Sequence, residues 1–185
     1  MASALTHAFV GSVMGKIIRG KDRMPRRFWI GLALTAALPD LDVVSFHLGI
    51  PYESPWGHRG FTHSLVFAAF LGWLTLELLR LGEKRFSRNW WMLWACFFLA
   101  TASHGLLDAM TNGGMGIAFF WPFRNARYFL PWRPILVSPV AFQAFFHHRA
   151  FAILKSEFLW VWIPVVLLWV LSAILRRVLG SERPK

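Results

Sequence analysis

Carboxyl and imidazole groups placed inside long apolar runs limit most strongly what this chain can fold into. The residues concerned are Asp40, Asp42, Asp108, His7, His63 and His104. An ionised carboxylate in hydrocarbon carries a large energetic cost unless another charge compensates it, so such residues mark functional positions. Carboxylate oxygens and imidazole nitrogens together are typical ligands of divalent metals. The pattern therefore predicts a metal site inside an apolar protein.

Composition places the chain in a membrane. Of its 185 residues 56% are hydrophobic, which is too apolar for an ordinary soluble domain. The formal net charge of +11 comes from basic residues between the apolar runs, and many of the 11 Trp and 18 Phe residues lie near run ends, as expected at a membrane interface. We therefore predict a bilayer as the partner and no nucleic acid. The single cysteine, Cys96, excludes an internal disulfide and is expected to be a small buried hydrophobe.

Five apolar stretches are expected to be helices: residues 3–18, 28–46, 62–82, 90–111 and 158–179. Four of these stretches are long enough to cross a bilayer core of about 30 Å, which needs about 20 helical residues. The first is short and carries Gly11 and Gly15, so it must tilt, pack closely on a neighbour or enter only part of the way. The predicted fold class is all-α, a single integral-membrane domain over residues 1–185 with four to five transmembrane helices.

The long segment 112–157 is expected to be an outer loop that contains an interfacial helix. Ser138 followed by Pro139 indicates a helix start, and the helix would continue toward Lys155. The polar residues of this segment favour a helix that lies on the bilayer over an additional span. They are Gln143, His147, His148 and Arg149.

Basic residues set the expected orientation. If alternate connections face the cytoplasm, that side holds fourteen Lys and Arg residues, and the other side holds six over longer loops. The positive-inside rule then places the N-terminus and residues 47–61 and 112–157 outside the cytoplasm. Asp40 lies roughly 18 Å, and His104 roughly 21 Å, from the cytoplasmic start of its helix. The candidate metal ligands, His7, Asp40, His63, His104 and Asp108, then all fall in the outer half of the membrane.

The spacing of the candidate ligands supports a shared site. His104 and Asp108 are four positions apart, so they share one helix face and can grasp one ion, although a hydrogen-bonded packing pair is the alternative. Asp40 and Asp42 would diverge by about 200° on a regular helix, but Pro39 can bend it. Either both carboxylates face the site, or one binds metal while the other orients a ligand histidine. A helix-ending turn at Pro39 is the remaining interpretation.

The segment from His58 to His63 contains two histidines five positions apart, with Arg59 between them. Arginine beside metal ligands is suited to gripping a phosphate or carboxylate through paired hydrogen bonds. The candidate catalytic residues are therefore Asp42, His58 and Arg59. Arg124 and Arg127 are candidate substrate-binding residues, either as headgroup contacts or as a second anion clamp, and His47 is expected at the interface.

Several motifs together resemble the YdjM-like family of predicted inner-membrane, metal-dependent hydrolases. The resemblance covers roughly residues 5–127 and rests on Thr6-His7 with the glycine-bearing stretch after it, Leu38-Pro39-Asp40-Leu41-Asp42, His58-Arg59-Gly60-Phe61-Thr62-His63-Ser64, His104-x-x-x-Asp108 followed by Thr111 and Gly113 or Gly114, and Trp121-Pro122-Phe123. It implies a multi-pass protein of the bacterial inner membrane with metal-dependent hydrolase activity. In ligand types and all-α setting the chain is also similar, more loosely, to the zinc phospholipases C, which hydrolyse phosphodiesters.

The leading hypothesis is a membrane-embedded hydrolase that binds one or two divalent ions, with zinc first and manganese, iron or magnesium as alternatives. Asp42 or His58 would take a proton, and Arg59 would neutralise developing charge. A site near the outer leaflet favours a phosphoester of a membrane lipid or lipid-linked molecule as the substrate. A divalent-metal or proton transporter and a non-catalytic membrane adaptor are the alternatives.

Overall fold

Helices form nearly all the regular structure of the protein. The computed structural model describes residues 1–20, 23–139 and 149–181. Its α-helices are α1 (Ala4–Arg19), α2 (Arg26–Ala37), α3 (Val44–His47), α4 (Leu65–Leu79), α5 (Arg88–Ala109), α7 (Ala150–Glu157) and α8 (Ile163–Ser181), joined by 3₁₀ turns at Leu38–Val43 and Phe61–His63 and a π-helical turn at Phe158–Trp162. The described residues contain no strand, only two isolated β-bridges. The all-α prediction is confirmed.

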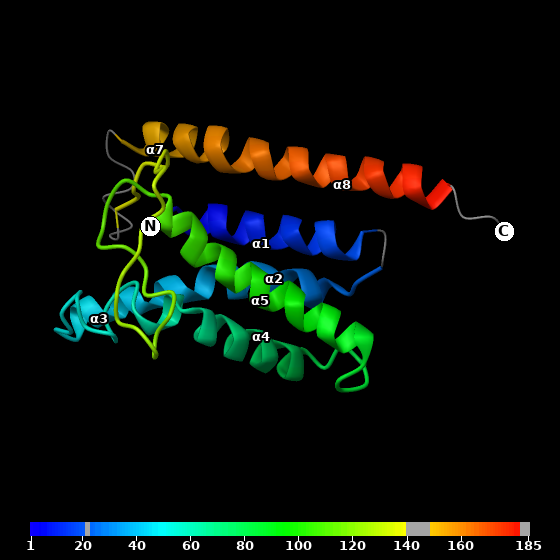
Figure 1. Ribbon diagram of the computed structural model, residues 1–185, viewed down its shortest axis with the longest axis horizontal. Coiled ribbons are helices and arrows are strands. Elements are labelled where there is room, and N and C mark those ends of the chain that lie inside the picture. Colours follow the sequence, from blue (N-terminus) through cyan, green and yellow to red (C-terminus); the bar gives the residue numbers. More distant parts are fainter. Residues whose placement is uncertain (21–22, 140–148, 182–185) are drawn as a thin grey trace.

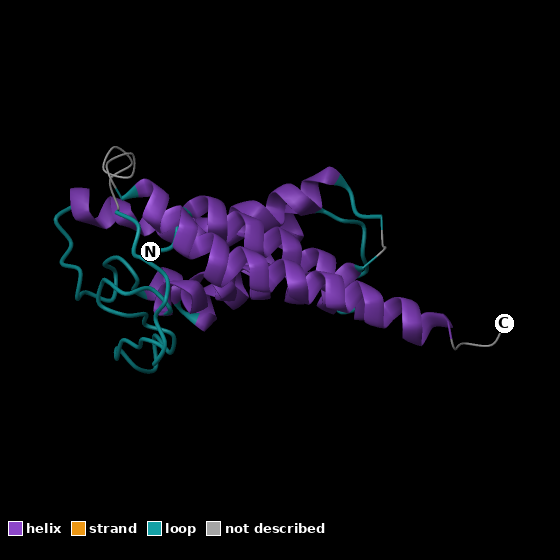
Figure 2. Ribbon diagram, turned by 90° about the horizontal axis from the view of Figure 1, so that it is seen from above, coloured by secondary structure: helices purple, strands orange, loops and turns teal. Residues whose placement is uncertain are grey.

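The long helices lie side by side as a bundle (Figure 1). The N-terminus and the loops that follow α5 lie at one end, and α8 runs along one edge and projects beyond the other helices at the opposite end (Figures 1 and 2). Helix α5 packs against α1, α2 and α4, whereas α8 contacts mainly α1. The main apolar core therefore forms where α2, α4 and α5 meet, and its fully buried members are Phe28, Leu32, Ala36, Cys96, Phe97 and Ala100.

Three helical segments are long and apolar enough to cross a membrane: Arg26–His47, Arg88–Ala109 and Ala150–Leu179. The first and second agree closely with the stretches expected at 28–46 and 90–111. Helix α1 has 16 residues, as expected for a short first helix, and α4 has 15, so they measure about 24 and 22 Å. The bundle is a multi-pass membrane protein in which two helices are shorter than a full span.

Two predicted boundaries differ from the structure. The stretch expected at 62–82 is α-helical only from Leu65 to Leu79, because Ser64 caps α4 by accepting a hydrogen bond from the Phe67 N–H at 3.0 Å and Arg80 ends it in the left-handed region at φ 43°. The last helix begins at Ala150, not at residue 158, so the end of the predicted interfacial helix belongs to the final span. Residues 140–148, with Gln143, His147 and His148, lie outside the described residues.

Glu157 ties the last span to the first helix. Its side chain is fully buried, and its carboxylate accepts hydrogen bonds from the Ser3 N–H at 2.6 Å, the Ser3 hydroxyl at 2.6 Å and the Thr6 hydroxyl at 2.7 Å. A carboxylate at a helix N-terminus satisfies unpaired N–H groups and complements the helix dipole. These contacts fix the first turn of α1, which carries His7, relative to the final span.

Close packing of α1 on α2 depends on Gly11, and we expect Gly11→Ala to destabilise the fold. A Cβ at Gly11 would lie 2.6 Å from the Ala36 Cβ and 2.9 Å from the Leu32 carbonyl oxygen, groups fixed to the backbone of α2. Overpacking of this kind lowers the free energy of unfolding by about 1–3 kcal/mol. Thermal unfolding of the purified protein in detergent measures the effect.

Gly15→Ala is the matched control, because it makes the same change one turn further along α1. Its Cβ would meet the Leu32 Cδ1 at 2.3 Å, the far end of a side chain that can rotate. The gain in helix propensity is the same for both variants. Gly15→Ala should therefore cost less, and equal losses at the two positions would contradict the packing argument.

Candidate metal centre

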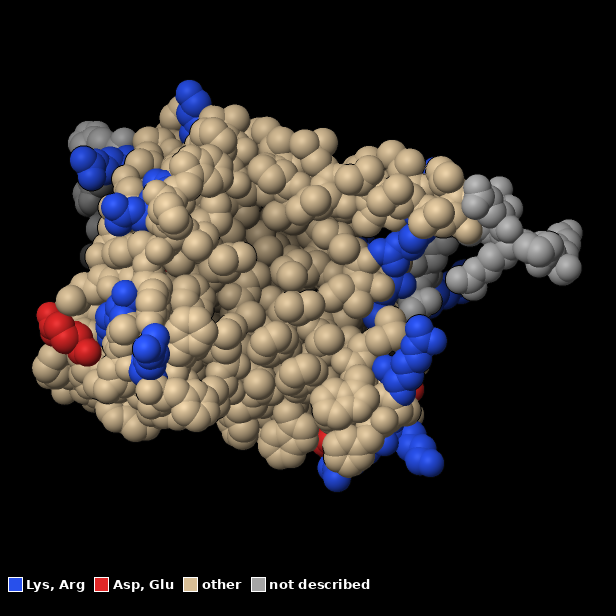
Figure 3. All heavy atoms as spheres, viewed as in Figure 1, with Lys and Arg blue, Asp and Glu red and all other residues tan. Residues whose placement is uncertain are grey.

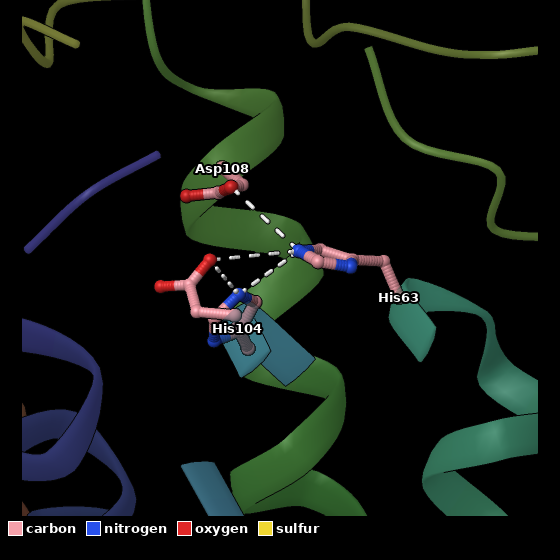
Figure 4. A group of neighbouring side chains, drawn as sticks. His63, His104 and Asp108 are labelled. Carbon is pink, nitrogen blue, oxygen red and sulfur yellow. Dashed lines mark hydrogen bonds and ion pairs between the residues drawn. The ribbon is translucent and has the colours of Figure 1, made fainter. Parts of the chain in front are cut away.

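Four elements deliver candidate ligands to one end of the bundle. His7 lies in α1, Asp40 in the 3₁₀ turn after α2, His63 in the turn before α4, and His104 and Asp108 in the last turns of α5. All five side chains are buried. One ligand atom from each of Asp40, His63, His104 and Asp108 lies within 4.8 Å of the others. Figure 4 shows the side chains of His63, His104 and Asp108 directed toward one another.

The Nε2 atoms of His63 and His104 face each other across the centre of the cluster. The Nε2 atoms of His63 and His104 lie 3.0 Å apart. The Nδ1 atom of His104 lies 2.7 Å from the Ala36 carbonyl oxygen, which only accepts, so this nitrogen donates its proton there. The Nδ1 atom of His63 lies 3.0 Å from the Thr62 hydroxyl oxygen, which donates its own proton to Asp42, and 3.2 Å from an Asp42 carboxylate oxygen, so this nitrogen also carries its proton. Both Nε2 lone pairs then point at each other, a repulsive contact unless a proton or a metal cation lies between them.

The neighbouring polar atoms favour a cation over a proton. Oδ1 of Asp40 lies 3.3 Å from Nε2 of His104, and neither Asp40 oxygen has a hydrogen-bond partner among the described residues. The ring of His7 stacks on that of His104 with centroids 3.7 Å apart, and neither of its nitrogens is hydrogen-bonded within the described chain. Nε2 of His7 lies 3.4 Å from Oδ1 of Asp108. One proton satisfies a single pair of such atoms, whereas a divalent cation can be held by several of them at once.

Asp42 contacts the segment 58–63, which carries His58 and His63. Its Oδ1 lies 2.5 Å from Nδ1 of His58. Its Oδ2 accepts hydrogen bonds from the Arg59 backbone N–H at 3.0 Å and from the Thr62 hydroxyl at 2.6 Å, and it also faces Nδ1 of His63. A carboxylate that holds the far nitrogen of a ligand histidine fixes both its tautomer and its ring orientation. Asp42 is therefore placed to orient His58 and His63.

The two aspartates of the Leu38–Val43 turn point to different partners because the α-helix is interrupted there. Pro39 lies in the first turn of the 3₁₀ segment, where its missing N–H removes no bond from the helix. Asp40 then faces the imidazoles of the cluster and Asp42 faces the following loop. Of the alternatives left by the sequence, this arrangement supports one carboxylate at the cluster and one that orients a ligand.

Arg59 compensates the charge of Asp108. Its side chain is fully buried, with Nε 3.1 Å from Oδ2 of Asp108, Nη1 donating to the Gly113 carbonyl at 2.8 Å and Nη2 donating to the Thr111 hydroxyl at 3.1 Å. Gly114 has φ +87°, and a Cβ there would lie 2.4 Å from Nη1 of Arg59. Glycine thus lets the loop after α5 close over the guanidinium. The action of Arg59 on a substrate stays a prediction.

The two arginines predicted to bind substrate lie outside the cluster. Arg127 donates from Nη1 to the His58 carbonyl at 2.9 Å and from Nη2 to the Tyr52 carbonyl at 2.7 Å, so it braces the loop that carries His58. Burial raises the pKa of the Tyr52 phenol, which remains a protonated hydroxyl beneath the Arg127 guanidinium. Arg124 and His47 are exposed. Contact of Arg124 or Arg127 with a substrate stays a prediction.

The formal charge around the cluster fits one divalent cation. Four carboxylates, Asp40, Asp42, Asp108 and Glu157, and two cations, the Arg59 guanidinium and the N-terminal ammonium that faces Asp108, give a formal charge of −2 when the histidines are neutral. A divalent ion brings that sum to zero, which removes the penalty of uncompensated charge away from water. The second close group, Asp42 with His58 and His63, already makes hydrogen bonds within itself. The residues present therefore fit one ion better than two.

Glu157 was missed at the level of sequence because the predicted span began one residue after it. A carboxylate in the run Phe151–Trp162, which is otherwise largely apolar, carries the same signal that identified Asp40 and Asp108. Its role is to position α1 and with it His7, since its hydrogen bonds reach Ser3 and Thr6.

These features define a multi-pass integral membrane protein with a buried group of His and Asp side chains that can bind a metal ion. The chain belongs to the YdjM inner membrane protein family, whose sequence profile matches residues 1–179. The inner membrane protein YbcI of Escherichia coli (strain K12) is 38% identical over 168 residues, which cover 91% of this chain and 95% of the relative. No solved structure matches the chain significantly. The resemblance to this family and the predicted location in the inner membrane are confirmed.

Metal content tests the cluster directly. We expect the purified protein to hold about one divalent ion per chain. The ligand atoms of Asp40, His63, His104 and Asp108 form the compact group. His104→Ala and Asp40→Asn should each lose most of the metal, because each removes a ligand atom from this group. Elemental analysis by mass spectrometry gives the stoichiometry. His47→Ala, which removes an exposed histidine outside the cluster, should keep the ion. Unchanged metal in His104→Ala would show that the group is not a metal centre.

The orienting role of Asp42 makes a separate prediction. Asp42→Asn should weaken metal binding by about 10–100-fold, since the Thr62 hydroxyl and the Nδ1 atoms of His58 and His63 lose the carboxylate charge that holds them, while every ligand atom of Asp40, His63, His104 and Asp108 remains. Competition with a chelator of known affinity measures the change. Glu53→Gln makes the same chemical change at an exposed site in the adjacent loop and should have no effect. Equal affinities of the wild type and Asp42→Asn would refute the role.

Proposed function

We propose that this protein is a membrane-embedded, metal-dependent phosphoesterase that acts on a lipid or lipid-linked substrate, with zinc as its ion. The observation that carries the proposal is the facing pair of Nε2 atoms of His63 and His104, 3.0 Å apart beside the unpartnered carboxylate of Asp40. Imidazole and carboxylate ligands in this number suit zinc. A divalent ion bound by such a group lowers the pKa of water toward neutrality and polarises a phosphoryl oxygen.

His58 is the side chain best placed to move a proton. Asp42 holds its Nδ1 atom at 2.5 Å, which leaves Nε2 as the basic nitrogen, and the rings of His58 and His63 have centroids 5.7 Å apart. A carboxylate and an imidazole paired in this way act as general base and then general acid in many hydrolases. In the proposed reaction water adds to phosphorus, the bond from phosphorus to the alcohol oxygen breaks, and the proton taken by His58 passes to the leaving alcohol.

An apolar cavity beside Asp42 supports a lipid as the substrate. The cavity holds about 360 Å³ and has Asp42 and Thr62 in its wall, so it adjoins the segment that carries His58 and His63. Its other lining residues are chiefly apolar and include Leu41, Val44, Leu48, Trp56 and Phe61. The first four of these are exposed on the outside of the bundle. An acyl chain seated in the cavity would bring the attached phosphoester toward the histidine segment.

Hydrolysis of phosphatidic acid and phosphatidylglycerol in phosphatidylcholine vesicles tests the proposal. We expect the zinc-loaded protein to cleave a lipid phosphoester, and His58→Gln to lower kcat by about 10²–10⁴-fold, as loss of a general base does. Metal content should stay at the wild-type level in His58→Gln, because His58 is not in the compact group of ligands. His47→Gln is the matched control and should retain full activity, since His47 is exposed.

Two outcomes of this assay would overturn the proposal. Metal-replete wild type that cleaves neither lipid, nor the soluble diester bis(p-nitrophenyl) phosphate, would remove the reaction class. Cleavage of the soluble diester with no turnover of either lipid would retain the reaction class but reject the lipid substrate.

A further inference from the structure

His7 differs from His63 and His104 in what holds its ring. Outer partners fix the Nδ1 atoms of His63 and His104, namely the Asp42 carboxylate at 3.2 Å and the Ala36 carbonyl at 2.7 Å. Neither nitrogen of His7 is hydrogen-bonded within the described chain. A ligand histidine is usually oriented by a hydrogen bond from its second nitrogen. The ring of His7 must therefore be placed by its stacking on His104 and by the helix that carries it.

The ring of His7 reaches the ligand carboxylates from α1. Its Nε2 atom lies 3.4 Å from Oδ1 of Asp108 and 3.9 Å from Oδ2 of Asp40. Both of these carboxylates supply ligand atoms to the compact group. A shift of the first turn of α1 would move Nε2 relative to both of them. The affinity for a metal ion should therefore depend on how firmly that turn is held.

Glu157 reaches His7 through a single residue, Ser3. The Glu157 carboxylate accepts hydrogen bonds from the N–H and the hydroxyl of Ser3, each at 2.6 Å, and Ser3 is the residue that caps α1. The Ser3 carbonyl in turn accepts the His7 N–H at 3.1 Å. Hydrogen bonds thus connect the carboxylate of the last span to the backbone of His7.

A π-helical turn directs a second side chain of the last span at the same point. Residues 158–162 form this turn, which is closed by a backbone hydrogen bond between residues five positions apart. On a regular α-helix Glu157 and Trp162 would point about 140° apart, whereas a π-turn brings residues five apart toward one face. Both side chains contact the Thr6 hydroxyl, which donates to Glu157 at 2.7 Å and accepts from Nε1 of Trp162 at 2.8 Å. Thr6 is the residue directly before His7.

A buried carboxylate is exceptional in this span. On the face displayed in Figure 3 the charged side chains gather at the two ends of the bundle, and the surface of α8 between them shows none. Only 6% of the most apolar part of the span is buried within the protein, whereas Glu157 is fully buried. A carboxylate away from water has a large energetic cost, so such a residue within a span indicates a function.

We infer that Glu157 is the positioning residue of His7, and that the last span thereby sets the affinity of the centre for its metal ion. None of the described residues of this span belongs to the compact group, so the span acts without supplying one of those ligand atoms. The inference rests on the metal centre of the proposed function and concerns metal binding alone. The last span is then a working part of the centre in addition to a membrane anchor.

A double-mutant cycle on Zn²⁺ affinity, measured by competition with a chelator, tests the inference. Glu157→Gln should bind Zn²⁺ about tenfold or more weakly than wild type, because an amide can replace only one of the two carboxylate oxygens that hold Ser3 and Thr6. His7→Ala should also weaken binding. In the His7→Ala background Glu157→Gln should have no further effect, since the side chain that it positions is absent.

Thr6→Val is a milder variant of the same link. It keeps the shape of the side chain and removes the hydroxyl that joins Glu157 and Trp162, so it should weaken Zn²⁺ binding in the wild-type background and not in the His7→Ala background. Thermal unfolding of the metal-free proteins verifies the fold of each variant. Glu77→Gln, the same chemical change in the last turn of α4, is the matched control and should leave Zn²⁺ affinity unchanged.

The absorption spectrum of the Co²⁺-substituted protein gives a readout that a general loss of stability would not move. It reports the ligand geometry of the ion, so Glu157→Gln should change it in the same direction as His7→Ala. Additive losses of Zn²⁺ affinity in the double variant would overturn the inference, and so would wild-type affinity in a folded Glu157→Gln. A wild type that binds no Zn²⁺ would instead remove the metal centre, and the proposed function with it.

Discussion

The neutralisation of carboxylates removed from water is the constraint on which the rest of this structure depends. Asp108 is fully buried in α5, and the Arg59 guanidinium 3.1 Å from its Oδ2 compensates it. Removal of one partner of such a pair leaves an unpaired buried charge, which costs about 3–5 kcal/mol. The loop after α5 folds back to supply the remaining acceptors of Arg59, at Thr111 and Gly113. One ion pair therefore connects the end of α5, the loop after it and the segment that carries Arg59, all beside the candidate metal centre.

The two ends of the bundle carry opposite chemistry. At the candidate metal centre, carboxylates and imidazoles face inward, and the guanidinium of Arg59 forms an ion pair with Asp108. At the other end, the described residues that line a cavity between α1 and α8 include Lys16, Arg19, Arg176 and Arg177. The positive-inside rule relates this basic end to the cytoplasm.

Helix positions could be predicted from the sequence because apolar length is a local property, and the spans at 26–47 and 88–109 depart from the expected ranges by two residues or fewer at each end. The grouping of His104 with Asp108 was also local, since four positions on a helix fix a common face. The different roles of Asp40 and Asp42 could not be predicted from the neighbouring sequence. They depend on which loop packs against each carboxylate, and the contacts of Asp42 lie 16 to 21 positions away. The hydrogen bonds of Glu157 to partners about 150 positions away were not local either, although its place in a largely apolar run was a local signal.

The packing beneath the candidate metal centre supports the proposed reaction over transport. A transport path would have to continue from His104 toward the other end of α5. Ala100, one turn along, and Phe97, two turns along, are fully buried, and Leu32 and Phe28 of α2 pack in the same apolar core. The nearby hydroxyl of Thr101 donates to the Phe97 carbonyl of its own helix at 3.0 Å and lies 3.4 Å from the Thr35 carbonyl of α2, so its proton is directed at the helix backbones. An ion entering this apolar core would lose its hydration with no ligand in exchange, a cost that one-sided chemistry at the cluster avoids.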